Sequence, residues 1–186
     1  MEAFPIDKRY TYADYASWDT EERYELIDGV PYLMAAPSDT HQRILGNLHG
    51  QFWNFLKGKP CTIRLAPYDV RLNAAGDSDG DVVQPDIVVI CDRAKLDDKG
   101  CNGAPDVVIE ILSPSNSRHD RVRKFNKYLR AGIREYWIVD PDDKVVMVSI
   151  LDNGRYYCTA YDETGTVPVQ ALGGCEISLP DVFSED

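Results

Sequence analysis

A carboxylate interrupts an apolar run near the middle of the chain. Glu110 lies within residues 107–112, Val-Val-Ile-Glu-Ile-Leu, and such a continuous branched run is typical of a strand covered on both faces. Carboxylates are seldom fully buried unless they are paired or bind a metal ion. Glu110 is therefore predicted either to bind a metal ion or to form a salt bridge with an Arg or Lys of a neighbouring helix.

A second carboxylate stands at the mouth of the preceding apolar run. Asp86 ends the tripeptide Gln84-Pro85-Asp86 and precedes Ile87-Val88-Val89-Ile90. Neighbouring strands lie about 4.8 Å apart, so carboxylates on adjacent strands can converge. Because Mg²⁺ typically uses one or two carboxylates together with waters and substrate phosphate, Asp86 and Glu110 are predicted to bind Mg²⁺ or Mn²⁺. Such an ion activates a water and stabilises charge on a phosphoryl group.

Another aspartate, Asp106 in Pro105-Asp106, competes with Asp86 for this position. Asp106 precedes Glu110 by four residues on the same expected strand, or roughly 13 Å at about 3.3 Å per residue. The two side chains are then too far apart to share one ion. The spacing favours Asp86, and Asp106 is expected at the solvent-facing start of the strand.

A sheet covered by helices is needed to position these carboxylates. Apolar residues recur at helical spacing over 41–57 and 118–131, with Gly58 and Gly132 as stop signals. Strands are expected over 62–72, interrupted near Pro67, and over 87–90, 107–112 and 136–139. The order is helix, three strands, helix, strand, in an α/β fold with a mixed central sheet. Further hairpins are predicted around Asp28-Gly29 and Asn153-Gly154.

Length and composition indicate one globular domain, 1–186, with a hydrophobic fraction of 44% and a charged fraction of 27%. No run approaches the roughly 20 apolar residues that cross a bilayer, and residues 1–12 carry no hydrophobic signal region. The chain is therefore predicted to be cytoplasmic, with no membrane partner. The five cysteines are odd in number and form no C-x-x-C pair, which indicates neither a disulfide framework nor a zinc site. We expect them to be small buried hydrophobes, or in the case of Cys101 an ordinary thiol in a loop.

The net charge of −11 is unfavourable for binding a polyanion. Basic residues nevertheless gather in one short segment, 118–130, which includes Arg121 and Arg123. This segment can present a local positive face on an acidic body, and Arg121 and Arg123 are the predicted phosphate contacts. The alternative is a solvated helix surface with no ligand.

These residues and this order of elements resemble a PD-(D/E)XK nuclease. Over nearly its whole length, the chain also resembles the Uma-two (Uma2) family of restriction endonucleases. The matching runs are Thr11-Tyr12 through Tyr15, residues 24–29, His41, residues 84–86, residues 108–115, Asp120-Arg121 with Lys124 and Tyr128, and residues 135–140. The resemblance implies a metal-dependent endonuclease that hydrolyses DNA phosphodiester bonds, and by analogy a homodimer.

One position departs from the superfamily pattern, because Leu112 stands where the catalytic lysine is expected. Lys124 is the candidate replacement. It shares one helix face with Asp120 and Tyr128, whereas Lys127 is rotated by about 300° from it. From this position Lys124 is expected to orient the water or to neutralise the phosphoryl group.

Two further residues are candidates for the site. Glu25 is balanced between a third carboxylate of the metal site and an edge-strand surface charge. His41, near the first turn of the long helix, can bind phosphate or orient a water, although a solvated or capping histidine is the commoner outcome. We slightly favour that common outcome.

The sequence leaves two other functions open. One is an inactive nuclease fold that serves as a nucleic-acid-binding or interaction module, in agreement with Leu112 and the acidic charge. In that case Glu110 would be paired with an arginine. The other is a nuclease that acts on RNA or branched DNA, because no base-reading motif is present.

Overall fold

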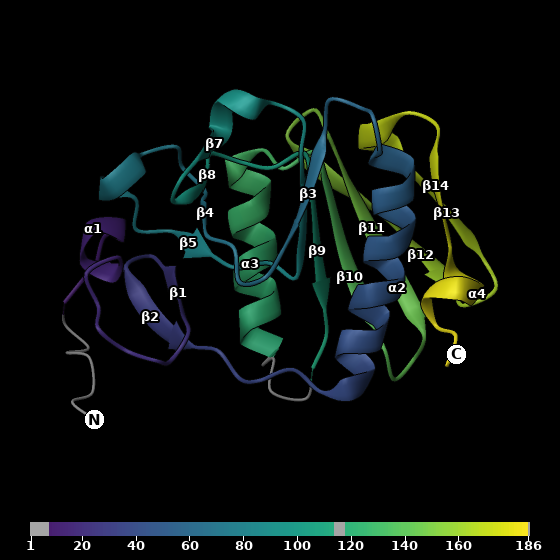
Figure 1. Cartoon of the computed structure of the whole chain (residues 1–186), viewed down its shortest axis with the longest axis horizontal. Coiled ribbons are helices and arrows are strands. Elements are labelled where there is room, and N and C mark those ends of the chain that lie inside the picture. The colour runs from purple at the N-terminus through teal and green to yellow at the C-terminus, as the bar shows by residue number, and fades with distance from the viewer. Residues whose placement is uncertain (1–7, 114–117, 186) are drawn as a thin grey trace.

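The central feature of the fold is a six-stranded mixed sheet (Figure 1). In the computed structural model residues 8–113 and 118–185 are described, with the backbone alone for residues 118–121. The sheet order is β12-β11-β10-β9-β6-β3. Its strands are β3 Thr62–Leu65, β6 Ile87–Ile90, β9 Val107–Ile111, β10 Glu135–Asp140, β11 Val145–Asp152 and β12 Arg155–Asp162. Strands β9 and β10 are parallel and the other neighbours are antiparallel. The predicted mixed α/β fold is confirmed.

Two long helices pack against this sheet, α2 Asp39–Leu56 and α3 Arg118–Ala131. Successive strand residues point to opposite faces of a sheet. Ile87 and Ile109 accordingly join the apolar cluster of α2, whereas Val88 and Val108 join the cluster that contains Tyr128 of α3. Counting only these two helices and the strands of the central sheet up to β10, the chain order is α2, β3, β6, β9, α3, β10, with short strands of a second sheet inserted between α2 and α3. No helix in the described part of the chain is long and apolar enough to cross a membrane.

A second six-stranded sheet has the order β2-β1-β5-β4-β8-β7. It contains β1 Tyr24–Ile27, β2 Val30–Leu33, β4 Val70–Arg71, β5 Val82–Val83, β7 Leu96–Asp97 and β8 Gly100–Asn102. The expected strand over 62–72 is divided at a cis peptide between Ala66 and Pro67, so β3 and β4 belong to different sheets. The β1–β2 hairpin turns at Asp28 and Gly29, whose φ angles are 53° and 71°, as its Asp-Gly sequence predicts.

Smaller elements complete the fold at both ends of the chain. Helix α1, Tyr12–Tyr15, begins with a capping box in which Thr11 and Asp14 bond to each other's backbone amides. A two-stranded sheet of β13 Thr166–Val169 and β14 Cys175–Ser178 precedes α4, Leu179–Val182, and packs against the α2 side of the core. Short 3₁₀ turns lie at Gly76–Ser78, Arg93–Lys95 and Gln170–Leu172.

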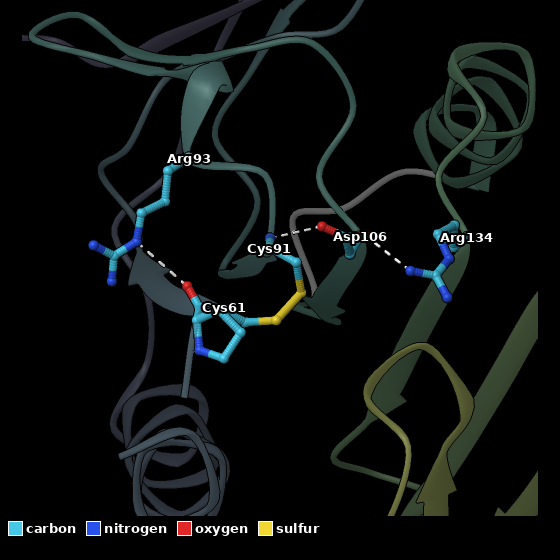
Figure 2. The surroundings of a disulfide bond; sticks show 6 residues. Cys61, Cys91, Arg93, Asp106 and Arg134 are labelled. Carbon is cyan, nitrogen blue, oxygen red and sulfur yellow. Dashed lines mark hydrogen bonds and ion pairs between the residues drawn. A yellow bond between two sulfur atoms is a disulfide. The ribbon is translucent and has the colours of Figure 1, made fainter. Parts of the chain in front are cut away.

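The expectation that no disulfide forms is wrong. Cys61 and Cys91 are joined across the start of β3 and the end of β6 with a sulfur–sulfur distance of 2.05 Å (Figure 2). The register pairs Thr62 with Ile90, so the next residues outward face each other. The number and spacing of cysteines in the sequence did not predict this bond, because the register of β3 and β6 is what brings the two thiols together. Of the remaining cysteines, Cys175 is buried as expected and Cys158 is exposed. Cys101 is buried on β8, so the alternative of a loop thiol is wrong.

Asp106 lies at this disulfide end of the sheet and is far along β9 from Glu110. Its Oδ2 accepts a hydrogen bond from the Cys91 amide at 2.7 Å, and its Oδ1 lies 3.1 Å from an Arg134 guanidinium nitrogen (Figure 2). Asp106 therefore caps the end of β6 and does not share a site with Glu110.

Candidate active site

Asp86 and Glu110 lie on neighbouring strands at the same end of the central sheet. The β6–β9 register pairs Ile87 with Ile109, so its continuation places Asp86 opposite Glu110. The Oδ2 atom of Asp86 accepts a hydrogen bond of 2.7 Å from the Ile111 amide. This bond fixes the Asp86 carboxylate across the strand that carries Glu110, as the sequence predicts.

Glu110 is buried against α3. Its Oε1 accepts a hydrogen bond of 2.6 Å from the Tyr128 hydroxyl and lies 3.1 Å from the Lys124 ammonium. Burial raises the pKa of Glu110 from 4.5 to about 7, with help from the negative charges of Asp86 and Glu25, while Lys124 and Tyr128 oppose this rise. The carboxylate therefore sits in a place where further positive charge is favourable.

Lys124 reaches the carboxylates from the middle of α3. Its Nζ lies 2.8 Å and 2.9 Å from the two Glu25 oxygens and 3.1 Å from Glu110 Oε1, and the residue is only 8% exposed. Lys127 instead pairs with Asp28 and Asp81, outside this cluster. The structure therefore places Lys124, and not Lys127, beside Glu110. The alternative of a salt bridge between Glu110 and a lysine of a neighbouring helix is thus present in the structure. The arginine partner expected for an inactive module is not among the partners of Glu110 in the described residues.

Glu25 is a buried member of the same cluster. Strand β1 lies between β2 and β5, so it is an inner strand of the second sheet. Glu25 is 4% exposed, and its Oε1 also accepts a hydrogen bond of 2.8 Å from the Gln84 amide. The alternative of an edge-strand surface charge is wrong, because the strand pairs on both sides and the side chain faces Lys124.

His41 is buried in the first turn of α2. Its Nε2 lies 3.2 Å from Asp86 Oδ2, and the residue is 6% exposed. Burial lowers the pKa of His41, but the hydrogen bond and charge of Asp86 and the charge of Glu110 outweigh burial, so the net pKa is raised. The expectation of a solvated histidine is wrong. Ser38 caps the helix and bonds the His41 amide, which directs this turn toward Asp86.

Two buried residues that the sequence did not single out for the site also shape it. Gln84 accepts hydrogen bonds from the Arg23 guanidinium and donates to the Tyr15 hydroxyl and to Asp69. This network anchors the segment that leads into Asp86. Tyr128 is fully buried and holds one oxygen of Glu110. The sequence signal for Tyr128 was its position one helical turn after Lys124, on the same face of the helix.

One pocket of about 300 Å³ gathers the predicted residues. Glu25, His41, Asp86, Glu110 and Lys124 all line it. Arg123 also lines the pocket, with its guanidinium carbon 4.8 Å from the centre of the Tyr32 ring. Arg121, the other predicted phosphate contact, has its side chain outside the described residues.

The chemistry of the donors fits a hydrated divalent cation. Among the described residues, no group of three or more His, Cys, Asp or Glu side chains could hold a metal ion. A cage built by the protein alone is therefore not formed by these residues. Mg²⁺, however, is commonly held by one or two carboxylates, with waters and substrate phosphate as the other ligands. Asp86 and Glu110, which line the same pocket, provide this smaller set of carboxylates.

Comparison with known proteins gives matches over most of the chain. The model of the Uma2 family, described as "Putative restriction endonuclease", matches residues 12–180. An uncharacterized protein of Synechocystis sp. is 26% identical over 164 residues, which cover 86% of this chain and 84% of that protein. A crystal structure from Anabaena variabilis, described as "a putative nuclease belonging to DUF820", has a TM-score of 0.75. It is 24% identical, and the match covers 93% of this chain and 97% of that one, which shows a shared fold.

Proposed function

Because this chain belongs to the Uma2 family, whose description is that of a nuclease, we propose that it is a Mg²⁺- or Mn²⁺-dependent endonuclease that hydrolyses DNA phosphodiester bonds. We assign its core to the PD-(D/E)XK type. One observation carries the proposal. Two carboxylates on adjacent strands, Asp86 and Glu110, line one pocket with a buried lysine, Lys124, from the following helix.

Asp86 and Glu110 would hold the ion, with the carbonyl of Ile111 as a further ligand. When bound, the ion lowers the pKa of a water and stabilises charge on the phosphoryl oxygens. Tyr128 and Lys124 both contact Oε1 of Glu110. Among the described contacts, Oε2 of Glu110 is thus the oxygen left available to a ligand. The Ile111 amide likewise orients Asp86 through Oδ2.

Lys124 and His41 supply positive charge at the phosphate. Lys124 is held between Glu25 and Glu110, so its ammonium is oriented before substrate binds. We assign to it the neutralisation of charge that develops on the phosphoryl group. His41, whose raised pKa favours the protonated ring, is positioned beside Asp86 to donate a hydrogen bond to a phosphate oxygen or water.

Metal binding by the metal-stripped protein tests the site. Mg²⁺ or Mn²⁺ at about 100 times its dissociation constant stabilises the native state by about 2.7 kcal/mol. For a chain of this size this corresponds to a rise in Tm of roughly 5–10 °C. Glu110→Gln and Asp86→Asn should lose this rise. Asp106→Asn removes a carboxylate from the other end of β9 and should keep it. Equal rises in all four proteins would contradict the assigned ligands.

Nicking of plasmid DNA tests the reaction itself. We expect nicking that requires Mn²⁺ or Mg²⁺ and disappears in Glu110→Gln. If the protein binds DNA but never cleaves it with either metal, the chain is an inactive nuclease-fold binding module. If RNA or branched DNA is cleaved and linear duplex is not, the substrate assignment changes while the metal site stands. Cutting both strands requires two such sites, so we propose a homodimer, which sedimentation can check.

A further inference from the structure

The pocket that holds the carboxylates has an apolar wall on its other side. Residues 32–37, Tyr-Leu-Met-Ala-Ala-Pro, all line the pocket, and they run from β2 into the segment before α2. Leu33 is 61% exposed and Leu45 of α2 adds a further apolar side chain. A site for phosphate alone needs no such wall, since phosphate offers only polar oxygens.

A stacked pair stands at this wall. The guanidinium of Arg123 lies over the Tyr32 ring at 4.8 Å, and both residues line the pocket. Arg123 immediately precedes Lys124, so α3 brings the stacking group and the catalytic lysine to the same pocket. Nucleobases stack on aromatic rings and on arginine guanidinium planes when they are unpaired. The pair therefore offers a platform for a base beside the reacting phosphate.

The size of the pocket favours a single nucleotide. A volume of about 300 Å³ is at the small end for sites that bind a small molecule. A duplex exposes phosphates and groove edges but keeps its bases stacked inside, so a base enters such a pocket only from a single strand or after flipping. The base of one nucleotide would contact the apolar residues of the pocket, and its phosphate would lie at the end where Lys124 supplies positive charge beside the carboxylates.

The overall charge points in the same direction. The chain has 31 acidic and 20 basic residues and a net charge of −11. Duplex DNA carries one negative charge per about 1.7 Å of axis, and each of its strands only one per about 3.4 Å. An acidic protein is repelled less by a single strand, for which stacking on Tyr32 and Arg123 can replace some of the missing ionic attraction.

We infer that this pocket binds an unpaired nucleotide next to the scissile phosphate, so that DNA with a single-stranded segment is preferred over intact duplex as the substrate. The inference rests on the proposed function for the cleavage step. It assigns Tyr32, Leu33 and Arg123 as the residues that select the substrate.

Binding of fluorescent oligonucleotides in EDTA tests the inference without cleavage. The probes are a short single-stranded DNA, the same strand annealed to its complement, and a single-stranded RNA of equal sequence. The wild type should bind the single-stranded DNA tightest. Tyr32→Ser should weaken that binding by roughly fivefold or more, in agreement with the strength of base stacking. Leu33→Ser should also weaken it through loss of apolar contact, and both variants should leave duplex binding unchanged. Tyr157→Ser is the control, because Tyr157 is 59% exposed and lies on β12, away from the pocket.

Duplex binding as tight as single-strand binding would overturn the inference, as would equal effects of Leu33→Ser and Tyr157→Ser. Tighter binding of RNA would overturn the choice of DNA. Cleavage assays separate the two proposals. If duplex and single-stranded DNA are cleaved equally well in a metal-dependent reaction, the proposed function stands and this inference is wrong. If single-strand binding depends on Leu33 but no probe is cleaved in Mn²⁺, the nucleotide pocket stands and the proposed nuclease activity is wrong.

Discussion

Replacement of Lys124 by methionine is the sharpest perturbation of this protein. The side chain of Lys124 is 9% exposed, and its carboxylate partners Glu25 and Glu110 are 5% and 9% exposed. Removing one partner of a buried ion pair costs about 3–5 kcal/mol, because the remaining charge stays buried without compensation. Lys124→Met leaves two such carboxylates facing each other. We expect a loss of about 3–5 kcal/mol in the free energy of unfolding and a fall in Tm of roughly 6–20 °C.

Lys127→Met is the matched control on the same helix. Lys127 pairs with Asp28, whose side chain is 67% exposed, and with Asp81, which also accepts hydrogen bonds from the Asp28 amide and from Asn73. Because these partners retain solvent or other donors, we expect a loss of only about 1–2 kcal/mol. Urea denaturation of the metal-free proteins at a pH above 7, where Glu110 with its pKa of about 7 is ionised, measures both losses. Equal losses in the two variants would refute the assignment of Lys124 as the cation of a buried cluster.

Two further variants separate charge from packing in this experiment. Glu25→Gln should restore part of the stability lost in Lys124→Met, because it removes one of the two opposed charges. The two substitutions should then be non-additive, as expected for residues in one network. Strict additivity would show that Lys124 acts through packing alone.

In nicking assays, Lys124→Met should be inactive, Lys127→Met should keep most activity, and Lys124→Arg should rescue poorly because a planar fork differs from an ammonium.

The remaining predictions concern titration, hydrogen bonding, substrate charge and the disulfide. The folded state keeps a proton on Glu110 that the unfolded state releases, so the free energy of unfolding of the metal-free protein should fall by about 3 kcal/mol between pH 4.5 and pH 7, at 1.36 kcal/mol per pKa unit. Glu110→Gln should not show this fall, and a curve of the same shape would contradict the shift. Tyr128→Phe removes the hydroxyl donor to Glu110 and should cost about 1.5–3 kcal/mol in urea denaturation at neutral pH, with a negligible loss arguing against the bond. Arg123→Glu should weaken DNA binding and make the affinity depend less steeply on salt concentration. An unchanged salt dependence would show that Arg123 does not contact a phosphate. Cys91→Ala opens a loop with a sequence separation of 30. In the absence of a reductant it should lower the free energy of unfolding by about 3–4 kcal/mol in the chain-entropy model. If the loss is equally large with dithiothreitol present, the disulfide is not its cause.

Local pattern was enough to predict the main elements and two of the site carboxylates. Glu110 stood out because a charge inside a continuous apolar run needs a partner, and Asp86 because it opens the neighbouring run. The order of the main helices and central strands along the chain and the turn at Asp28-Gly29 followed from the same kind of signal, since turn residues and hydrophobic periodicity act over a few residues. The face shared by Lys124 and Tyr128 followed from helix geometry, and both do contact Glu110.

What tertiary structure alone decided is the environment of residues that are far apart in sequence. Whether Glu25 was a surface charge depended on β5 pairing with the far side of β1, and no residue near Glu25 carries that information. His41 became buried because α2 packs its first turn against Asp86, and the Cys61–Cys91 bond formed because β3 and β6 pair in one register. Residues 32–37 likewise line the same pocket as Asp86 and Glu110 only through the tertiary fold. Periodicity reports which side of an element is buried, whereas pairing between distant strands determines what that side meets.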